Sequence, residues 1–212
     1  MDRIKQENDY HFTTNYASAQ EHVPEAERNN RVIKERCRAT FHSVPFSALP
    51  KLMLITMAME SARKLNYFPS KNGVSKYYSP RDILHQKKLD YQKHCLIPQF
   101  SDVLATDEPT PTNSMKGRAI EAIYLRPTSS VQGGHQLMNL KTGALITRAH
   151  VQVLPMPDSV INAVNALAAR QGMATGLKIT TKSGNIIYDS ALPAGVDSTN
   201  PNITQENDYN DD

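Results

Sequence analysis

The sequence has few of the residues that staple small extracellular domains or build membrane spans. Its 212 residues include only two cysteines, Cys37 and Cys95, so cysteine alone supplies neither a disulfide framework nor a four-ligand zinc site. No apolar run approaches the length of a membrane span, and the longest, Leu52 to Met59, is interrupted by Thr56. The first ten residues contain no apolar segment typical of a secretory signal. We therefore expect an intracellular protein, nuclear or cytoplasmic, with no membrane partner.

Large aromatic side chains are scarce as well. Aromatic residues make up 7% of the chain and tryptophan is absent, whereas hydrophobic residues reach 39%. The chain can therefore fold, but around a core of modest size, as one ordinary domain or two small ones. The seven histidines are scattered, and none has the His-x3–5-His spacing that completes a zinc finger.

The small net charge of +3 conceals an uneven distribution. Residues 22–99 carry 14 basic and 6 acidic residues, whereas residues 156–212 carry 3 basic and 7 acidic ones. A basic block in an otherwise neutral to acidic chain is typical of a protein that binds a polyanion, most often a nucleic acid. A solvated helical face without a ligand is the alternative, and composition does not decide between the two.

The spacing of apolar residues predicts helices in the first half of the chain. The first helix runs over Pro24–Ser43, with the proline in its first turn. The second runs over Ser47–Asn66, is capped by Ser47, and is apolar nearly all round, which predicts a buried packing helix. A Pro-, Ser- and Lys-rich connector follows, with a short helix at Arg81–His85 capped by Ser79.

After Pro98 the pattern changes from helical to short strands. The strand candidates are Phe100–Ala105, Ala119–Leu125, Gln136–Leu140 and Ala144–Leu154. Lys141-Thr142-Gly143 is a hairpin-sized loop, and Gly133-Gly134 indicates a turn because no strand–Gly–helix context for phosphate binding surrounds it. Four or five short strands within about 55 residues predict a small barrel.

The chain closes with a helix and a hairpin. Val160–Gln171 has one apolar face, with Asp158 or Ser159 as its cap and Gly172 as its end. The hairpin turns at Ser183-Gly184-Asn185. The expected class is α+β, and its segments are a disordered N-terminus (1–20), two helices (21–68), a linker (69–99), a barrel (100–155), a helix plus hairpin (156–192) and a disordered tail (193–212).

One helix face gathers the residues that can carry chemistry. One helix face in EHVPEAERNNRVIKER carries Glu27, Asn30, Arg31 and Lys34, because their spacing is i, i+3, i+4 and i+7. The two cations suit a phosphate backbone, whereas a lone carboxylate holds a hard cation only with help from other oxygen ligands. The alternative is an ordinary surface helix with Glu–Arg and Glu–Lys pairs.

The segment AERNNRVIKE closely resembles the glutamate-bearing helix of copia-type retrotransposon integrases, which are part of a Pol polyprotein. MAMESARKLNYFPSKNGVSKYYSPRDIL is similar to the helix and linker that follow it, and AIEAIYLRPTSSVQGGHQLMNLKTGALITRAHVQVLPMP resembles the SH3-like barrel after the integrase core. GLKITTKSGNIIYDSALPAGVD is similar to the segment that joins integrase to reverse transcriptase. The resemblance implies helices from the end of an RNase H-like core, an SH3-like β-barrel and a helix–hairpin extension.

The resemblance also implies a chemistry. In that family three carboxylates hold two Mg²⁺ ions, which activate water or a DNA 3′-hydroxyl for attack on a phosphodiester. Glu27 matches the third carboxylate and would be both catalytic and metal-binding. The residues that would contact DNA are Arg28, Asn30, Arg31, Lys34 and Arg38. The first two carboxylates belong on strands upstream, and the 26 residues before Glu27 contain no strand-like run, so we expect a DNA-binding fragment that is catalytically incomplete alone.

Other interpretations stay open. The chain could be a non-catalytic interaction module that binds a full-length integrase or a second copy of itself, because its apolar second helix would seek a partner. It could also be the unfolded relic of a decayed element. Arg126 and Arg148 of the expected barrel either touch DNA or are ordinary solvated side chains. A Cys–His nucleophile pair is the alternative to two ordinary thiols.

Overall fold

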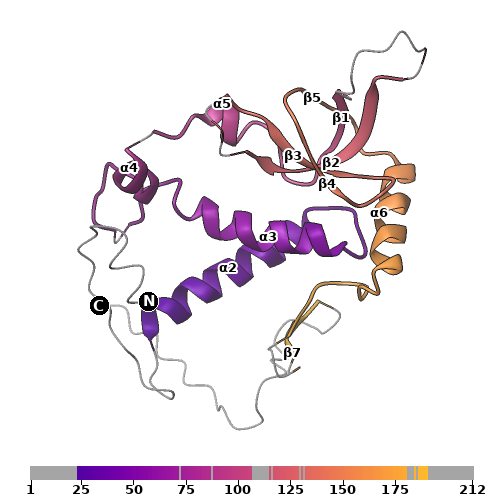
Figure 1. The fold of residues 1–212 in the computed structure, drawn as a ribbon. Helices are drawn as coiled ribbons and strands as arrows, with labels where there is room; N and C mark the ends of the chain where they lie inside the picture. Colours follow the sequence, from indigo (N-terminus) through magenta and orange to yellow (C-terminus); the bar gives the residue numbers. More distant parts are fainter. Residues whose placement is uncertain are drawn as a thin grey trace, which may run out of the picture.

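The chain is an α+β protein whose helices pack on one antiparallel sheet (Figure 1). The computed structural model describes residues 23–71, 73–86, 88–106, 115, 117–128, 130, 132–180, 184 and 186–190, so both segments expected to be disordered lie outside the described residues. The helices are α2 (Pro24–His42), α3 (Lys51–Lys64), α4 (Pro80–His85), α5 (Tyr91–His94) and α6 (Asp158–Arg170). The strands are β1 (Asp102–Thr106), β2 (Ala119–Pro127), β3 (His135–Asn139), β4 (Leu145–Arg148), β5 (Val151–Val153), β6 (Lys178–Thr180) and β7 (Ile186–Asp189).

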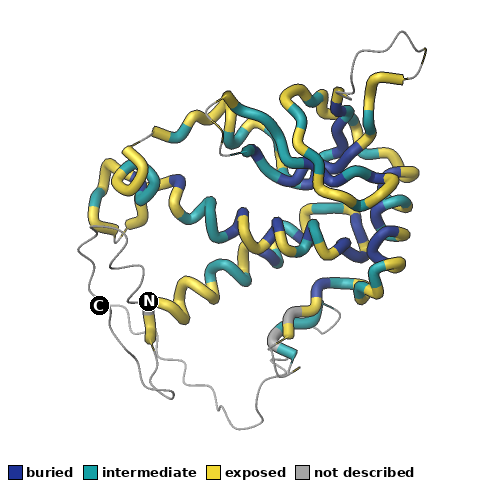
Figure 2. Tube along the Cα trace, viewed as in Figure 1, coloured by how far each residue is buried: buried dark blue, intermediate teal, exposed yellow. Residues whose placement is uncertain are grey.

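Helix α2 begins at Pro24, as the sequence predicts. The N–H groups of the first turn have no acceptor within a helix, so a proline there costs no helical hydrogen bond. The helix ends at His42, and the Ser43 hydroxyl donates to the Thr40 carbonyl at 2.8 Å. Its C-terminal half packs on α3 through Cys37 and Phe41, which are both buried. The described side chains before residue 31 are exposed, so the N-terminal half of α2 projects from the body (Figure 2).

Helix α3 is shorter than predicted, and Ser47 does not cap it. The helix starts after Pro50, whose extended backbone (ψ 153°) interrupts the helical path. Side chains on and just after α6 instead bind the chain where it leads into the helix. The carbonyl oxygen of the Asn165 side chain accepts from the loop amides of Ser47 (3.1 Å) and Ala48 (3.3 Å), and that of Gln171 accepts from the Lys51 amide, the first of the helix (2.7 Å). Tertiary contacts therefore hold the entry to α3.

The prediction that α3 is buried on all sides is wrong. Met53 and Met57 are fully buried, and the same face buries Thr56, Glu60 and Ser61. On the opposite face, Ile55 is 57% and Met59 is 47% exposed. An apolar middle therefore does not distinguish a core helix from one that buries a single face.

The five-stranded sheet has the order β4-β3-β2-β1-β5, and every neighbouring pair is antiparallel. The single strand predicted over Ala144–Leu154 is in fact two strands, β4 and β5, which lie at opposite edges of this order. Only Ala149 and His150 join them, a link whose ends can lie at most about 11 Å apart. The edges of a flat five-stranded sheet lie about 19 Å apart, so this sheet must curl until its edges approach each other.

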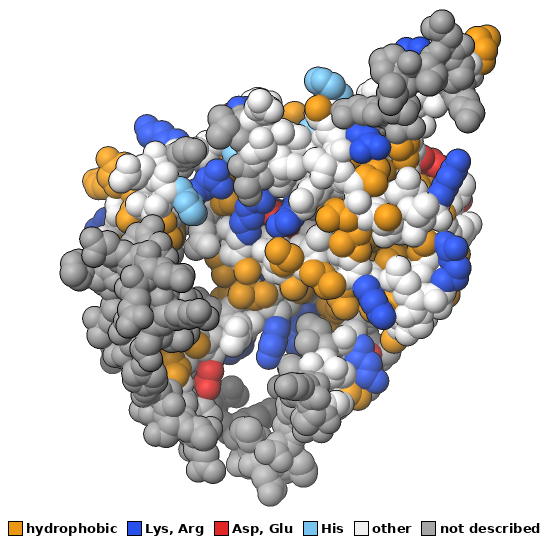
Figure 3. Space-filling model, in the orientation of Figure 1, with side chains coloured by type: hydrophobic (Ala, Val, Ile, Leu, Met, Phe, Trp, Pro, Cys, Tyr) orange, Lys and Arg blue, Asp and Glu red, His pale blue; other side chains and the backbone are white. Residues whose placement is uncertain are grey.

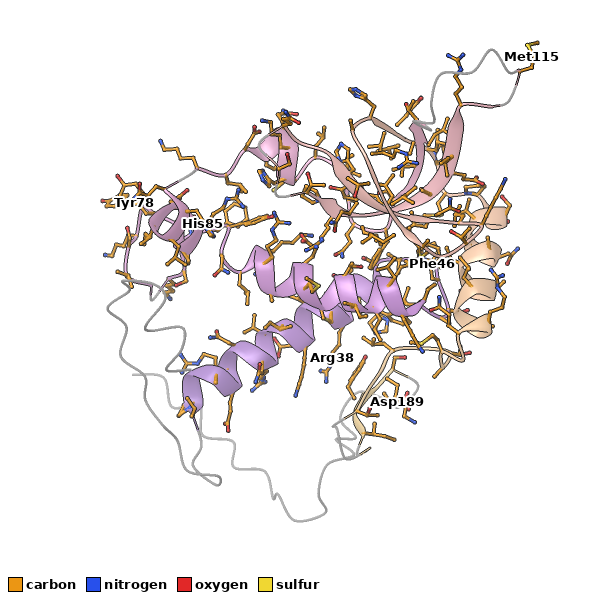
Figure 4. The ribbon with its side chains drawn as sticks, viewed as in Figure 1. Arg38, Phe46, Tyr78, His85, Met115 and Asp189 are labelled. Carbon is orange, nitrogen blue, oxygen red and sulfur yellow. The ribbon has the colours of Figure 1, made fainter. Side chains whose placement is uncertain are left out.

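The curl creates two apolar cores, one on each face of the sheet. Alternate residues of β2 serve different cores, because successive side chains of a strand point to opposite faces. Ala122 and Tyr124 pack in the smaller core with Val103 of β1. Ile123 and Leu125 pack in the larger core, which the sheet shares with α2, α3 and α6. Phe46, labelled in Figure 4, belongs to this larger core beside α6.

Helix α6 and the hairpin complete the larger core. The predicted face of α6 is confirmed, with Val160, Val164 and Leu167 buried. Its predicted cap is wrong, because Pro157 precedes the helix and Asp158 lies inside it. Its predicted end is confirmed: Gly172 adopts φ 66° and donates to the Ala169 carbonyl, while the next amide donates to Ala168. This is a Schellman motif, which requires a left-handed residue at that position.

The C-terminal strands β6 and β7 pair as the predicted hairpin. Of the predicted turn residues, only Gly184 is among the described residues. The hairpin contacts α2 through Tyr188, whose ring lies 3.9 Å from the Arg38 guanidinium carbon. The Tyr188 hydroxyl also lies 3.4 Å from Nε2 of His42. The last described strand therefore packs on the first described helix.

Asn165→Ala tests the tertiary contact that holds the loop before α3. The substitution leaves the Ser47 and Ala48 amides without their acceptor, so we expect the free energy of unfolding to fall by about 1–2 kcal/mol in urea denaturation. Asn162→Ala, on the exposed side of the same helix, is the matched control and should change stability by less than about 0.5 kcal/mol. Equal effects of the two substitutions would show that Asn165 acts only through helix propensity.

Candidate nucleic-acid interface

The residues singled out in the sequence lie on α2, at the end of the helix that projects from the body (Figure 1). Glu27, Arg28, Asn30 and Arg31 are exposed, and Lys34 is half-buried nearer to α3. The helix register places Asn30 and Arg31 one turn after Glu27, and Lys34 one turn further, on the same face. The structure therefore brings these four residues together as the spacing predicts, on a surface that a large ligand can reach.

Arg31 forms the kind of pair that the surface-helix interpretation expects. Its Nε donates to the Glu35 carboxylate at 3.1 Å, and the two side chains are 80% and 54% exposed. An exposed i,i+4 pair stabilises a helix by only about 0.3–0.5 kcal/mol and weakens with salt. A phosphate group can displace such a weak intramolecular partner, so the pair does not prevent Arg31 from binding an anion.

Arg38 differs from the other predicted DNA contacts. Its guanidinium stacks over the Tyr188 ring, and its Nε is buried. A cation over an aromatic ring contributes about 0.5–2 kcal/mol, depending on how far the pair is removed from water. The structure therefore gives Arg38 a packing role between α2 and the hairpin. Sequence spacing could not reveal this role, because the partner lies 150 residues further along the chain.

Lysine and arginine side chains are spread around the face drawn in Figure 3, while hydrophobic side chains gather over α3. The two arginines that the sequence singles out after residue 100 have partners within the sheet region. Arg126 donates from Nε to the Gln136 side chain at 2.6 Å, and Arg148 donates to the Thr147 carbonyl at 2.8 Å. Like the Arg31–Glu35 pair, these bonds do not prevent an arginine from binding an anion.

The described residues do not build a magnesium site. Among them there is no group of three or more histidine, cysteine, aspartate or glutamate side chains that could hold a metal ion. Glu27 alone cannot hold two ions, because Mg²⁺ requires several oxygen ligands in octahedral geometry. Both thiols are free: Cys37 is buried and lies 3.5 Å from the Ser61 hydroxyl, and Cys95 is half-buried. No step of metal chemistry is therefore assigned to these residues.

A polar cluster that the sequence did not predict lies between α3, α5 and the end of β2. The buried Glu60 carboxylate pairs with Arg63 at 3.2 Å, and Arg63 also donates to the Pro127 carbonyl at 3.4 Å. The guanidinium carbons of Arg63 and Arg81 lie 5.9 and 5.6 Å from the centre of the Tyr67 ring. Burial raises the pKa of the Tyr67 hydroxyl, and the two arginines act against that rise.

His94 links this cluster to α5. Its Nδ1 lies 2.8 Å from the Asp90 carbonyl, and its Nε2 lies 3.2 Å from a terminal nitrogen of Arg81. A guanidinium can only donate, so Arg81 is the donor of its contact with Nε2. The two contacts hold the imidazole ring between α5 and Arg81.

Among the described residues, no helix combines the length and the apolar character needed to cross a bilayer. Comparisons with models of known families, with curated proteins and with solved structures give no match. What the chain does must therefore be argued from its own residues.

Asp102, at the start of β1, is the most buried ionisable group among the described residues of the five-stranded sheet, with 1% of its surface exposed. Burial raises the pKa of its carboxyl, the Glu121 carboxylate adds to the rise, and a hydrogen bond from the Val103 backbone opposes it. A raised pKa in the folded state means that the stability this group provides is present below its unfolded pKa. That stability is lost as the pH rises through the folded value.

Asp102→Asn should therefore unfold at higher urea concentration than the wild type at pH 7. Its advantage should shrink as the pH is lowered toward the ordinary pKa of aspartate, about 3.9, because the raised pKa lets the folded wild-type carboxyl gain its proton above that value. Urea denaturation at several pH values measures both. A variant that is less stable than the wild type at pH 7 would contradict this account of the buried carboxyl.

Proposed function

We propose that this chain is the nucleic-acid-binding part of a copia-type retrotransposon integrase, a protein of DNA integration whose intact parent is a Mg²⁺-dependent polynucleotidyl transferase. The observation that carries the proposal is the placement of the glutamate-helix motif. Asn30 and Arg31 sit with Glu27 on the exposed, projecting half of α2. Buried motif residues would have argued for a purely structural helix.

The sheet supports the same proposal. A meander of four strands with a fifth strand returned to the first is compatible with the small SH3-like barrel that the resemblance implies. The two helices next to it, α2 and α3, would correspond to the last helices of an RNase H-like core. The chemistry would belong to the parent, in which Glu27 is the third carboxylate and Mg²⁺ would activate the attacking water or hydroxyl. In this chain the function is binding.

The charge distribution supplies the physical basis for that binding. The basic block falls on α2, α3 and the segments after them, while the acidic excess falls beyond the barrel. Cations in this block release counterions when they neutralise phosphates, which gives affinity without sequence selectivity. We therefore propose that duplex DNA is bound through Arg28, Asn30, Arg31 and Lys34.

A second candidate function is a non-catalytic interaction module. The exposed face of α3 favours it, because Ile55 and Met59 form an apolar stripe one turn apart. Such a stripe would suit a full-length integrase or a second copy of the chain. Size-exclusion chromatography with light scattering discriminates: a monomer at all concentrations argues against self-association.

The unfolded-relic alternative meets a physical objection. The helices bury Met53 and Met57 against the barrel and α6, so they do not need the sheet of a complete integrase core. A continuous core of this kind predicts a cooperative thermal transition by circular dichroism, whereas a relic would melt gradually.

Arg31→Ala/Lys34→Ala tests the duplex interface. If each cation contacts one phosphate, the slope of log affinity against log salt should fall by about 1.8, or about 0.9 per lost contact. Fluorescence anisotropy of a labelled DNA duplex over a salt series gives the slope. Lys141→Ala/Arg170→Ala removes two exposed cations elsewhere and is the matched control. A flat salt response of the wild type, or equal slopes for the two variants, would exclude DNA binding through α2.

A further inference from the structure

Residues 66–71 and 73–84, which we call the 66–84 lobe, belong to a closed surface loop and to the start of α4. The Arg81 amide donates to the Asn66 carbonyl at 3.1 Å and closes the loop at its base. At that base Tyr67 is 4% exposed and lies between two arginine side chains. A capping box, in which Ser79 and Asp82 exchange hydrogen bonds, fixes the start of α4. The lobe is therefore anchored at several points.

The outer side of the lobe is apolar despite this anchoring. Val74 is 99%, Tyr77 is 87% and Leu84 is 75% exposed. Three further exposed apolar residues of the lobe are Phe68, Tyr78 and Ile83. Val74, Tyr78, Pro80, Ile83 and Leu84 line a shallow pocket of about 210 Å³. Tyr78 lies at the outer end of the molecule, away from the sheet (Figure 4).

Anchored loops of 6–16 residues with close ends are frequently functional, and clustered apolar exposure marks a binding surface. Nothing in the barrel core requires these side chains to be apolar, because they do not pack there. Polar residues at these positions would cost no core contact. We conclude that the lobe presents a docking surface.

The charges around the lobe indicate which class of ligand it binds. Lys71, Lys76 and Lys88 are exposed, and none of them forms an ion pair within the described part of the chain. The nearby carboxylates are already engaged, since Asp82 accepts from the amide and hydroxyl of Ser79 and Asp90 pairs with Lys93. Exposed tyrosines beside unpaired lysines suit a ligand that carries many negative charges and also has flat apolar groups that can stack on the tyrosine rings.

We propose that the 66–84 lobe binds single-stranded nucleic acid, a second contact that rests on the nucleic-acid-binding function proposed above. Unpaired bases stack on Tyr77 and Tyr78, and the phosphate backbone follows Lys71 and Lys76. A duplex hides its base faces, so it cannot make the stacking contacts. The lobe therefore distinguishes single strands and frayed ends from the duplex that α2 holds.

Fluorescence anisotropy of the full chain with labelled oligo(dT) of about 16 nucleotides tests this contact. Tyr77→Ala/Tyr78→Ala should weaken oligo(dT) binding by about tenfold or more and leave the salt slope unchanged. Lys71→Ala/Lys76→Ala should lower that slope by about 1.4, or about 0.7 per phosphate. Tyr77→Phe/Tyr78→Phe keeps both rings and should keep the affinity. Tyr91→Ala removes an exposed ring on α5, outside the lobe, and should have little effect.

The outcomes separate this inference from the duplex interface. If Tyr77→Ala/Tyr78→Ala loses oligo(dT) binding and retains duplex binding, the result supports the lobe. This holds whatever effect Arg31→Ala/Lys34→Ala has on duplex binding. Oligo(dT) binding that is equal in the Ala variant and the wild type overturns the lobe and leaves the α2 interface standing. Tyrosine-dependent binding to poly-glutamate as tight as to oligo(dT) also overturns it, because the lobe would then fit an acidic protein.

Discussion

The burial of one face of α3 is the constraint on which the rest of the structure depends. Met53 and Met57 are fully buried because α2 and β2 pack on α3 and residues of α6 join the same core. Fully burying two such side chains stabilises the fold by about 3–6 kcal/mol relative to leaving them in water. The sheet thus serves as a packing surface for the helices, and the helices and the sheet share the larger core.

That packing decides which part of α2 is available for function. Cys37 and Phe41 fix the C-terminal half of the helix on α3, and Arg38 fixes its outer side under Tyr188 of the hairpin. The described side chains of α2 before residue 31 are exposed and carry most of the motif into solvent. The same helix therefore has a structural end, where a cation stacks on an aromatic ring, and an exposed end, where the cations face water.

Some local features were predictable from the sequence, and long-range partners were not. The start of α2, the Ser79 cap of α4 and the stop at Gly172 each depend on neighbours within a few residues, so residue types alone specify them. The predicted caps of α3 and α6 were wrong, because prolines precede both helices. The contact of Asn165 with the loop before α3 and the stacking of Arg38 depend on residues over 100 positions away. The split of the last predicted strand places β4 and β5 at opposite edges of the sheet, which no local pattern encodes. For the site, the shared face of Glu27, Asn30, Arg31 and Lys34 was predictable from spacing, whereas the exposed lobe around Tyr77 was not.

Amide chemical-shift mapping of the full chain during titration with a short DNA duplex tests the central claim most directly, because it reports every contact without altering a residue. The account predicts that the largest shifts fall on residues 27–34 of α2, with small changes in α6 and in the strands that face the larger core. Shifts confined to the barrel and its loops, or no shifts at low salt, would contradict a nucleic-acid interface on α2.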